Sequence, residues 1–370
     1  MPAGKPIETL SIAALNRATL ARQMLLERED CAVVTAVERL AGIQTQAPNP
    51  PYFGLWSRLR DFDQAQLSRE ITGRRLVRIA LMRATLHLVS ARDALAWRPL
   101  LQTVQERMLR ANRNRNLTGV DLDALVKAGR ALVEAEPLSA ADLGKRLAQR
   151  WPQYEPATLS MAVRSLVPLV QVPPRGLWGG KGLAMHTTAE HWLGQALDTT
   201  PSLEAMLRRY LAAFGPASVK DAQTWCGLKD LRAVFERMSG TLVRFRDEAG
   251  VELFDLPDAP RPAPDTPAPV RFLGDWDNLL LSYVDRRRVI AGTHRHIYTA
   301  NGQMPGTVLV DGFVRASWKI LPSRDATELE IRLLAPLPRR ARKPVVEEGR
   351  ALLEFAAPGV AHALRFVEAD

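Results

Sequence analysis

Apolar residues recur every three or four positions along most of the chain, and this spacing predicts amphipathic helices. Val33, Val37 and Leu40 illustrate the pattern, because they place three aliphatic side chains on one helix face. Shorter segments alternate instead: Val243 and Phe245 are separated by an arginine, which is typical of a strand. The pattern therefore predicts a mainly α protein with β structure, of the α+β class.

The predicted elements repeat in one order, in which helices are followed by a pair of strands. This is the order of a winged helix, whose most frequent use is nucleic-acid binding. We expect three tandem winged-helix units that form a concave basic surface, and we expect at least one of them to be structural. The units span 8–116, 117–198 and 199–257. Their predicted helices are 11–28, 33–43, 53–59, 64–72, 122–134, 138–151, 156–166, 203–214, 218–226 and 231–238, and their predicted strands are 76–82, 85–89, 169–172, 182–186, 241–246 and 251–256.

A proline-rich segment at 257–269 follows the third unit and predicts a linker. Beyond it, 270–370 predicts a β-rich C-terminal module. Val308–Arg315 has Asp-Gly at its centre, which is typical of a tight hairpin turn. The remaining predicted elements of this module are strands at 329–333 and 363–367 and a helix at 345–355.

One position interrupts the apolar pattern with an amide. Gln44 lies four residues after Leu40, where the helix face would carry another aliphatic side chain, and burying an unpaired amide costs about 1–3 kcal/mol. Pro48 disfavours helix at the residue before it, so we expect the chain to leave the helix around 45–47. In extended backbone Gln44 and Gln46 would face the same side, whereas in a helix they would lie about 200° apart. The more frequent arrangement is a hydrogen-bonded Gln44 at a helix end and a surface Gln46.

The net charge of the chain is the feature of its composition that says most about a binding partner. Lysine and arginine number 50 against 40 aspartate and glutamate residues, which gives a net charge of +10 and a pI near 10. This balance favours a phosphate-rich partner, although genome composition also drives arginine usage. No apolar run is long enough to span a membrane, and the N-terminus lacks the apolar core of a signal peptide. The two cysteines, Cys31 and Cys226, are far apart and predict thiols of a cytoplasmic protein.

Several kinds of catalytic site are not predicted. The six histidines are scattered, and no zinc pattern, serine-hydrolase motif or phosphate-binding glycine loop occurs. We therefore expect no metal and no cofactor. Asp275 or Asp277 could act as a base, but a capped turn before the apolar 279–281 segment is the more frequent arrangement.

Five motifs together resemble the AlkZ/YcaQ family of winged-helix DNA glycosylases, and the resemblance covers nearly the whole chain. They are Leu15-Asn16-Arg17-Ala18, Gly42-Ile43-Gln44-Thr45-Gln46, Pro51-Tyr52-Phe53-Gly54-Leu55-Trp56-Ser57-Arg58-Leu59, Met82-Arg83-Ala84-Thr85-Leu86-His87-Leu88-Val89 and Asp277-Asn278-Leu279-Leu280-Leu281-Ser282. The Gln-x-Gln motif resembles the AlkZ branch, which acts in self-resistance to a crosslinking antibiotic, rather than the Gln-x-Asp branch. Thr45 departs mildly from the aliphatic residue usual at the middle position.

The resemblance implies a monofunctional glycosylase in which Gln44 and Gln46 are catalytic. Alkylation at N7 or N3 gives a purine a positive charge and makes it a good leaving group, so the enzyme need only position water and tolerate an oxocarbenium-like sugar. A crosslinked base cannot swing freely into a pocket, so an open concave surface would suit it. A hairpin such as 308–318 could wedge into a groove and expose the bond.

The expected partner is double-stranded DNA, bound by a monomer. The side chains that we expect to contact it are Arg83, Arg286, Arg287, Arg288, His294, Arg295, His296 and Arg315. Two alternatives remain open: a transcriptional regulator without catalytic activity, and a structural nucleic-acid binder. Release of 7-methylguanine from DNA separates the glycosylase from both.

Overall fold

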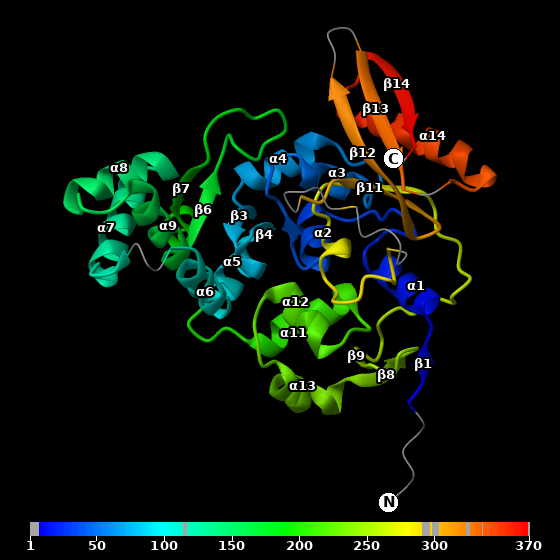
Figure 1. The fold of residues 1–370 in the computed structure, drawn as a ribbon, viewed down its shortest axis with the longest axis horizontal. Coiled ribbons are helices and arrows are strands. Elements are labelled where there is room, and N and C mark those ends of the chain that lie inside the picture. Colours follow the sequence, from blue (N-terminus) through cyan, green and yellow to red (C-terminus); the bar gives the residue numbers. More distant parts are fainter. Residues whose placement is uncertain are drawn as a thin grey trace, which may run out of the picture.

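The computed structural model describes residues 7–113, 117–290, 297, 303–322, 326–334 and 336–368. It is a mixed α/β fold in which a central group of helices and strands is flanked by three peripheral groups (Figure 1). One group of helices lies at the left end of that view, a second at the bottom, and the C-terminal sheet at the upper right.

The central group begins with four helices, as the hydrophobic pattern predicts. Ser11 caps the first helix by accepting a hydrogen bond from the amide of Ala14, and Asp63 caps the fourth in the same way. Two further helices, which the pattern did not predict, follow the first hairpin. The helices are α1 (Ile12–Arg22), α2 (Val33–Arg39), α3 (Pro50–Trp56), α4 (Gln64–Thr72), α5 (Ala91–Leu100) and α6 (Gln102–Arg113).

A six-stranded sheet joins the first two predicted units. Its order is β2-β4-β3-β6-β7-β5, and the predicted hairpins β3–β4 and β6–β7 pair directly through Ile79 and Val170. The two hairpins therefore share one sheet. The strands are β2 (Ile43–Gln44), β3 (Leu76–Ala80), β4 (Leu86–Ser90), β5 (Leu138–Ser139), β6 (Leu169–Val172) and β7 (Met185–Thr188). Three helices lie at its far end: α7 (Leu122–Ala135), α8 (Ala140–Arg150) and α9 (Pro156–Leu166) (Figure 1).

The third predicted unit contains its predicted helices and hairpin. The hairpin is extended by β1 (Thr9–Leu10), which pairs in parallel with β8. The elements are α11 (Leu203–Phe214), α12 (Val219–Cys226), α13 (Arg232–Met238), β8 (Val243–Asp247) and β9 (Glu252–Asp255), and a short helix that was not predicted, α10 (Ala189–Leu193), precedes them at the end of the second unit. The proline-rich segment 257–269 contains no helix or strand. It is nevertheless held in place, because Arg17 and Arg22 of α1 donate hydrogen bonds to the carbonyls of Thr266 and Pro260.

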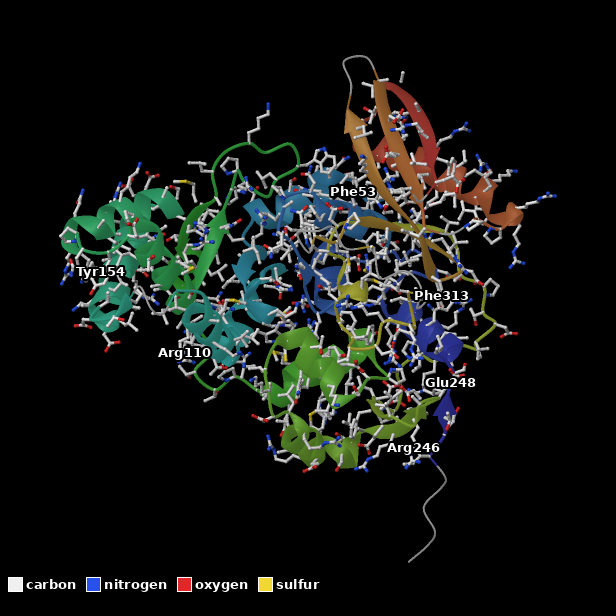
Figure 2. The ribbon with its side chains drawn as sticks, in the orientation of Figure 1. Phe53, Arg110, Tyr154, Arg246, Glu248 and Phe313 are labelled. Carbon is white, nitrogen blue, oxygen red and sulfur yellow. The ribbon has the colours of Figure 1, made fainter. Side chains whose placement is uncertain are left out.

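The C-terminal module is a five-stranded sheet with one long helix, as its β-rich pattern predicts. Its order is β10-β11-β12-β13-β14, antiparallel except for the parallel pair β13–β14. The elements are β10 (Arg271–Leu273), β11 (Gly306–Val310), β12 (Phe313–Pro322), β13 (Ala326–Leu333), α14 (Arg339–Ala356) and β14 (Ala361–Val367). Phe53 of α3 contacts Trp318 of this sheet edge to face, with ring centroids 5.3 Å apart (Figure 2).

The hydrophobic cores cross the predicted unit boundaries. One core joins β3 and β4 to α11, α12 and α13. Another joins α2, α3 and α4 to the C-terminal sheet and α14. The elements around β2 are thus buried from two sides, which fixes the segment that carries the glutamine pair. No helix in the described ranges is long and apolar enough to cross a membrane.

The tip of the β11–β12 hairpin, which we expected as a wedge, lies against α1, and its insertion into a groove stays a prediction. Asn16 of α1 donates to the carbonyl of Gly312, and Arg17 donates to the carboxylate of Asp311 at 2.5 Å. A side chain at Gly312 would come within 2.4 Å of Asn16 Oδ1, so the turn lies directly against the helix. The Leu15–Ala18 motif therefore anchors the hairpin tip on α1.

Candidate active site

Gln44 and Gln46 lie at the end of β2 and at the start of the turn that follows it. Gln44 belongs to β2 and is paired with His87 of β4, and the amide of Thr45 continues the ladder by donating to the carbonyl of Leu86 at 2.8 Å, after which the chain bends at Gln46. Extended backbone would place both glutamines on one side and Thr45 on the other, and this arrangement stays a prediction. The chain has left the helix before residues 45–47, as expected, but the helix ends earlier than predicted, at Arg39 rather than residue 43.

The early helix end comes from two residues in the left-handed region, Ala41 and Gly42, with φ of 53° and 89°. The amide of Gly42 donates back to the carbonyl of Val37 at 3.0 Å, which is the closing hydrogen bond of the helix. A β-carbon at Gly42 would lie 2.8 Å from Val89 Cγ1, so the strand passes very close. Asn278 then donates to the carbonyl of Gly42 at 3.0 Å and fixes the start of β2.

The segment after the glutamines is stiff. Thr45 Oγ1 donates to the carbonyl of Ala47 at 2.9 Å, and α3 begins at Pro50, a position that suits proline. Gly274 lies beneath this turn, where a β-carbon would come within 2.7 Å of the Pro50 carbonyl. Arg78 of β3 donates to the carbonyl of Thr45 at 3.0 Å from the opposite side. The pair is therefore presented by a firmly held turn.

The two amides have different surroundings. Gln44 is only 5% exposed, and its Oε1 accepts a hydrogen bond from Arg83 Nη2 at 2.6 Å. Gln46 is exposed, and no hydrogen bond joins its side chain to another residue that the structure describes. One amide is thus fixed within the protein and the other is free to meet a ligand or water.

Two guanidinium groups stand close to this segment, those of the buried Arg78 and the half-buried Arg83. Burial lowers the pKa of Arg78 to about 10 and, more strongly than the nearby Arg286 charge, lowers the pKa of Arg83 to about 10. No carboxylate in the described residues pairs with either group. Nε and Nη1 of Arg78 are buried without a hydrogen-bond partner among those residues. The two guanidinium charges therefore give a positive electrostatic potential on the protein side of the glutamine segment.

His87 lies beside Gln44 as a neutral group. Burial and then the Arg83 charge lower its pKa to about 3. Its Nδ1 lies 2.9 Å from the carbonyl of Thr85, which can only accept, so Nδ1 carries the proton and Nε2 faces Arg83 as an acceptor at 3.5 Å. His87 therefore supports Arg83 without adding charge.

The predicted DNA-binding arginines lie in different surroundings. Arg286 lies close enough to Arg83 for the two charges to repel, and it is half-buried. Arg287 is exposed and pairs with Asp285 at 2.6 Å. Arg288 is buried, donates to the carbonyl of Pro216, and stacks over Tyr283. The three guanidinium groups therefore do not form one solvated cluster, contrary to what their sequence run suggests.

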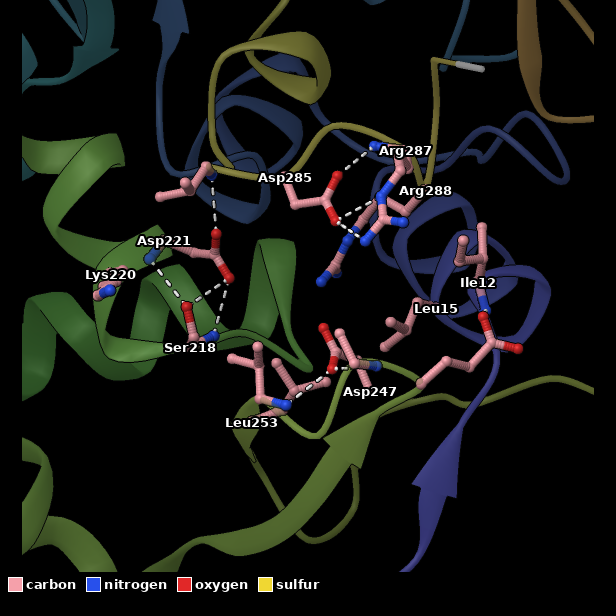
Figure 3. Close-up of a pocket in the computed structure, with 14 residues that line it drawn as sticks. Ile12, Leu15, Ser218, Lys220, Asp221, Asp247, Leu253, Asp285, Arg287 and Arg288 are labelled. Carbon is pink, nitrogen blue, oxygen red and sulfur yellow. Dashed lines mark hydrogen bonds and ion pairs between the residues drawn. The ribbon is translucent and has the colours of Figure 1, made fainter. Parts of the chain in front are cut away.

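Arg287 and Arg288 line a pocket of about 370 Å³ whose other lining residues are apolar side chains, four carboxylates, a serine and a lysine (Figure 3). The carboxylates outnumber the cationic side chains, so it is a poor site for a phosphate; they belong to Asp221, Asp247, Glu248 and Asp285. Arg315 is half-buried on β12. His294, Arg295 and His296 lie outside the described residues. DNA binding by all these side chains stays a prediction.

A second pocket, of about 460 Å³, opens beside the turn that follows Gln46. It is lined by three aromatic side chains, by Asp275 and by residues 47–50 of the turn. Burial raises the pKa of the Asp275 carboxyl above its usual value. Asp277 faces elsewhere: it caps the 278–280 turn and pairs with Arg58, as the capped-turn interpretation predicts. The aromatic residues of the pocket are Phe53, Trp178 and Trp318.

The sequence did not identify the residues that hold the pair. Arg78 had a signal, because it is a charged residue within an otherwise apolar strand. Asn278 and the carbonyl of Trp225, which accepts from Arg83, had none. In the ranges that the structure describes, no three His, Cys, Asp or Glu side chains gather closely enough to hold a metal ion.

Comparisons with known proteins show the family of this chain and its fold. The sequence profile of the family described as "DNA glycosylase AlkZ-like" matches residues 37–355. An interstrand DNA cross-link repair glycosylase of Streptomyces sahachiroi is 26% identical over 342 residues, which cover 88% of this chain and 90% of that protein. The solved structure of Streptomyces sahachiroi DNA glycosylase AlkZ has the same fold, with a TM-score of 0.80, 22% identity and coverage of 97% of this chain and 100% of that one.

Proposed function

The chain belongs to the family of AlkZ-like DNA glycosylases, and from this premise we propose that it is a monofunctional glycosylase of purines alkylated at N7 or N3. The observation that carries this proposal is the pair of amides at one firmly held turn, of which Gln44 is fixed by a hydrogen bond and Gln46 is exposed. We assign the catalytic role to Gln44 and Gln46.

The chemistry suits neutral amides. The oxygen of a water molecule bonds to C1′ of the deoxyribose, and the bond from C1′ to the base breaks with its electron pair going to the base. The alkylated base is positively charged before this step and neutral after it, so no acid is needed to protonate it. The proton of the water passes to solvent, and an abasic site remains. The amides orient the water and stabilise the transition state by fixed dipoles.

We extend the proposal to bulky and crosslinked adducts. The exposure of Gln46 supports it, because an adduct tied to the opposite strand can reach an exposed group but not a closed pocket. The aromatic pocket beside the turn offers apolar faces and the Asp275 carboxylate to the cationic base of such an adduct. In this proposal the helix-and-hairpin units at 8–116, 117–198 and 199–257 supply the basic DNA-binding surface.

The test is base release by two variants. We expect Gln44→Ala and Gln46→Ala each to slow release of 7-methylguanine from duplex DNA by about 100-fold or more, because each removes an amide that holds the attacking water in the transition state. Release is measured as alkali-labile cleavage of a labelled duplex under single-turnover conditions, with a crosslinked duplex as second substrate. Dissociation constants for undamaged DNA should stay within about threefold, because the lost group acts on the reaction.

Gln153→Ala is the matched control, since Gln153 is an exposed glutamine between α8 and α9. It should release base at the unchanged rate. Strand cleavage without alkali, or a borohydride-trapped covalent complex, would contradict a monofunctional enzyme. Full activity of both catalytic-pair variants would refute the assignment of the site, and sequence-specific binding without any base release would identify a transcriptional regulator instead.

A further inference from the structure

We propose that Arg83 is a positioning residue that locks the amide of Gln44 in one orientation, with its oxygen turned into the protein and its N–H₂ group toward the substrate. This inference rests on the proposed function, because it assigns a role within the same site. It separates the two glutamines into a hydrogen-bond donor, Gln44, and an acceptor, Gln46.

The orientation follows from the chemistry of the contact. A guanidinium group has five N–H donors and no acceptor, so the Gln44 atom that lies 2.6 Å from Arg83 Nη2 must be the carbonyl oxygen. The amide nitrogen is then at the other end of the group. No described residue accepts a hydrogen bond from it, and it is not among the buried atoms without a partner. The N–H₂ group is thus accessible at the site.

Arg83 is itself held by strong constraints. Its Nη1 donates to the carbonyl of Trp225, in the last turn of α12, where helix carbonyls lack partners and the helix dipole favours a cation. Gly227, just after α12, lies against its backbone: a β-carbon there would come within 3.2 Å of Arg83 Cα. His87 Nε2 faces Nη2 as a neutral acceptor. One guanidinium therefore ties together β2, β4 and α12.

The backbone of Arg83 is strained to reach this position. Arg83 and Ala84 both have positive φ, of 55° and 56°, although neither is glycine or asparagine. Two consecutive residues of this kind in the left-handed region are energetically unfavourable and persist only where the surroundings impose them. The strained turn between β3 and β4 directs Arg83 inward to Gln44. It thereby turns Arg83 away from the DNA phosphates, which its positive charge would otherwise favour.

The consequence for the reaction is a division of roles. Gln46, which is exposed and without a described partner, offers its oxygen to a proton of the attacking water. Gln44 donates from its nitrogen to the oxygen of that water, so the two amides hold one water molecule between a donor and an acceptor. The charge-assisted bond from Arg83 to Oε1 polarises the amide and strengthens the N–H donor.

The first experiment uses Arg83→Met and Arg83→Lys in the full chain, with single-turnover release of 7-methylguanine as the readout. We expect Arg83→Met to slow release by about 10- to 100-fold. The variant displaces the Gln44 amide from its catalytic position, although it removes no group that contacts the substrate. The DNA dissociation constant should change by less than about twofold, since Arg83 contacts protein atoms. Arg83→Lys should recover part of the rate, because an ammonium group can still donate to Oε1.

Arg98→Met is the matched control. Arg98 is buried and also donates to a glutamine oxygen, on Gln102, and to a backbone carbonyl, on Ser165, but it touches neither catalytic glutamine. It should lower the melting temperature at least as much as Arg83→Met while the release rate stays unchanged. Equal rate losses in both variants would make Arg83 a structural residue, and a rate loss matched by weaker DNA binding would make it a DNA contact; either result overturns the proposal.

The second experiment tests the donor role with Gln44→Glu, which keeps an oxygen for Arg83 but has no N–H group. We expect it to be as inactive as Gln44→Ala. If Gln44→Glu retains activity within about threefold, the donor assignment is wrong. If Gln44→Ala is itself fully active, the proposed catalytic pair fails, and this outcome is distinct from a failure confined to Arg83.

Discussion

At the scale of single residues, the site depends on cations that lack carboxylate partners. Arg78 is buried and Arg83 is half-buried, and among the described residues they donate only to carbonyl or amide oxygens and approach a neutral ring nitrogen. A carboxylate at either place would neutralise the charge, but it would also compete for the guanidinium with the Thr45 carbonyl and the Gln44 amide. Neutral partners keep the full charge directed at the glutamine segment.

The neutrality of the buried histidines gives a prediction about pH. Burial lowers the pKa of His87 to about 3 and that of His186 to about 4, against 6.5 for an ordinary histidine. Below about pH 6.5 these two histidines therefore bind protons in the unfolded chain but stay neutral in the folded protein. The free energy of unfolding should be highest above that pH and fall on acidification toward pH 4, by up to about 1.4 kcal/mol per pH unit for each histidine.

Urea unfolding at intervals from pH 7.5 to 5 measures this dependence. His87→Gln and His186→Gln should each flatten the slope, whereas His191→Gln, at an exposed position of α10, should leave it as it is. A free energy of unfolding that does not change between pH 7.5 and 5 would show that both rings are protonated in the folded protein or accessible to solvent.

The local sequence marked Gln44 as an amide where the apolar pattern expects an aliphatic residue, and the resemblance then singled out Gln44 and Gln46 as a pair. The partner of Gln44 could not be identified in this way. Arg83 is 39 residues away, and its sequence context carries no glycine or asparagine to indicate the left-handed turn that directs it inward. Arg83 was predicted to contact DNA because its charge suits phosphate, and only the tertiary contacts show that its donors are taken up by protein atoms.

At the scale of elements, most helices and strands followed from the hydrophobic period, and the misplaced boundaries have local causes. Helix α2 was expected to continue to residue 43 because Pro48 was taken as its stop. The helix stops at Ala41 and Gly42, which both have positive φ, and Ala41 occupies the usual left-handed position just after the C-cap Leu40, where an alanine gives no signal in the sequence. The two-residue strands β1, β2 and β5 were not predicted, because so few residues show no period and their pairing is decided by their neighbours.

Gly42 gives the prediction at this scale. Gly42→Ala combines a positive φ with a contact of 2.8 Å to Val89, so we expect it to lower the free energy of unfolding by about 2 kcal/mol or more. The displaced β2 should also slow base release, because Gln44 and the Asn278 hydrogen bond move with it. Chemical denaturation and single-turnover release measure the two effects.

Gly250→Ala is the control for Gly42→Ala, because Gly250 also has a positive φ, of 78°, but its β-carbon would meet no atom within 4 Å. It should cost about 1 kcal/mol of stability and leave the release rate unchanged. A Gly42→Ala variant with normal release would mean that the start of β2 does not control the position of Gln44.

At the scale of the whole molecule, segments far apart in the sequence meet around the glutamine turn. The C-terminal segment 274–278 supplies both the glycine beneath Pro50 and the asparagine that holds Gly42. That segment is in turn held by Asp277, whose carboxylate binds Arg58 of the segment after α3 through two hydrogen bonds of 2.8 and 2.9 Å. The predicted boundary at 270 thus separates parts that share one core, although the division into units stays a prediction.

The ion pair of Arg58 and Asp277 gives the prediction for the whole molecule. Both side chains are buried, so removing one partner leaves an unpaired charge inside the protein, and Arg58→Met should cost about 3–5 kcal/mol in the free energy of unfolding. Guanidinium chloride denaturation followed by fluorescence measures it. The exposed pair of Arg232 and Glu252 is the control, and Arg232→Met should cost less than about 1 kcal/mol.

The double variant Arg58→Met with Asp277→Leu separates the charge from the contact. Because it leaves no unpaired charge, it should be more stable than Arg58→Met alone, in a single cooperative transition. Base release should nevertheless stay slow in the double variant, since Asn278 follows Asp277 directly and loses its fixed position against Gly42. Recovery of both stability and release would show that the ion pair maintains the fold without positioning the glutamine turn.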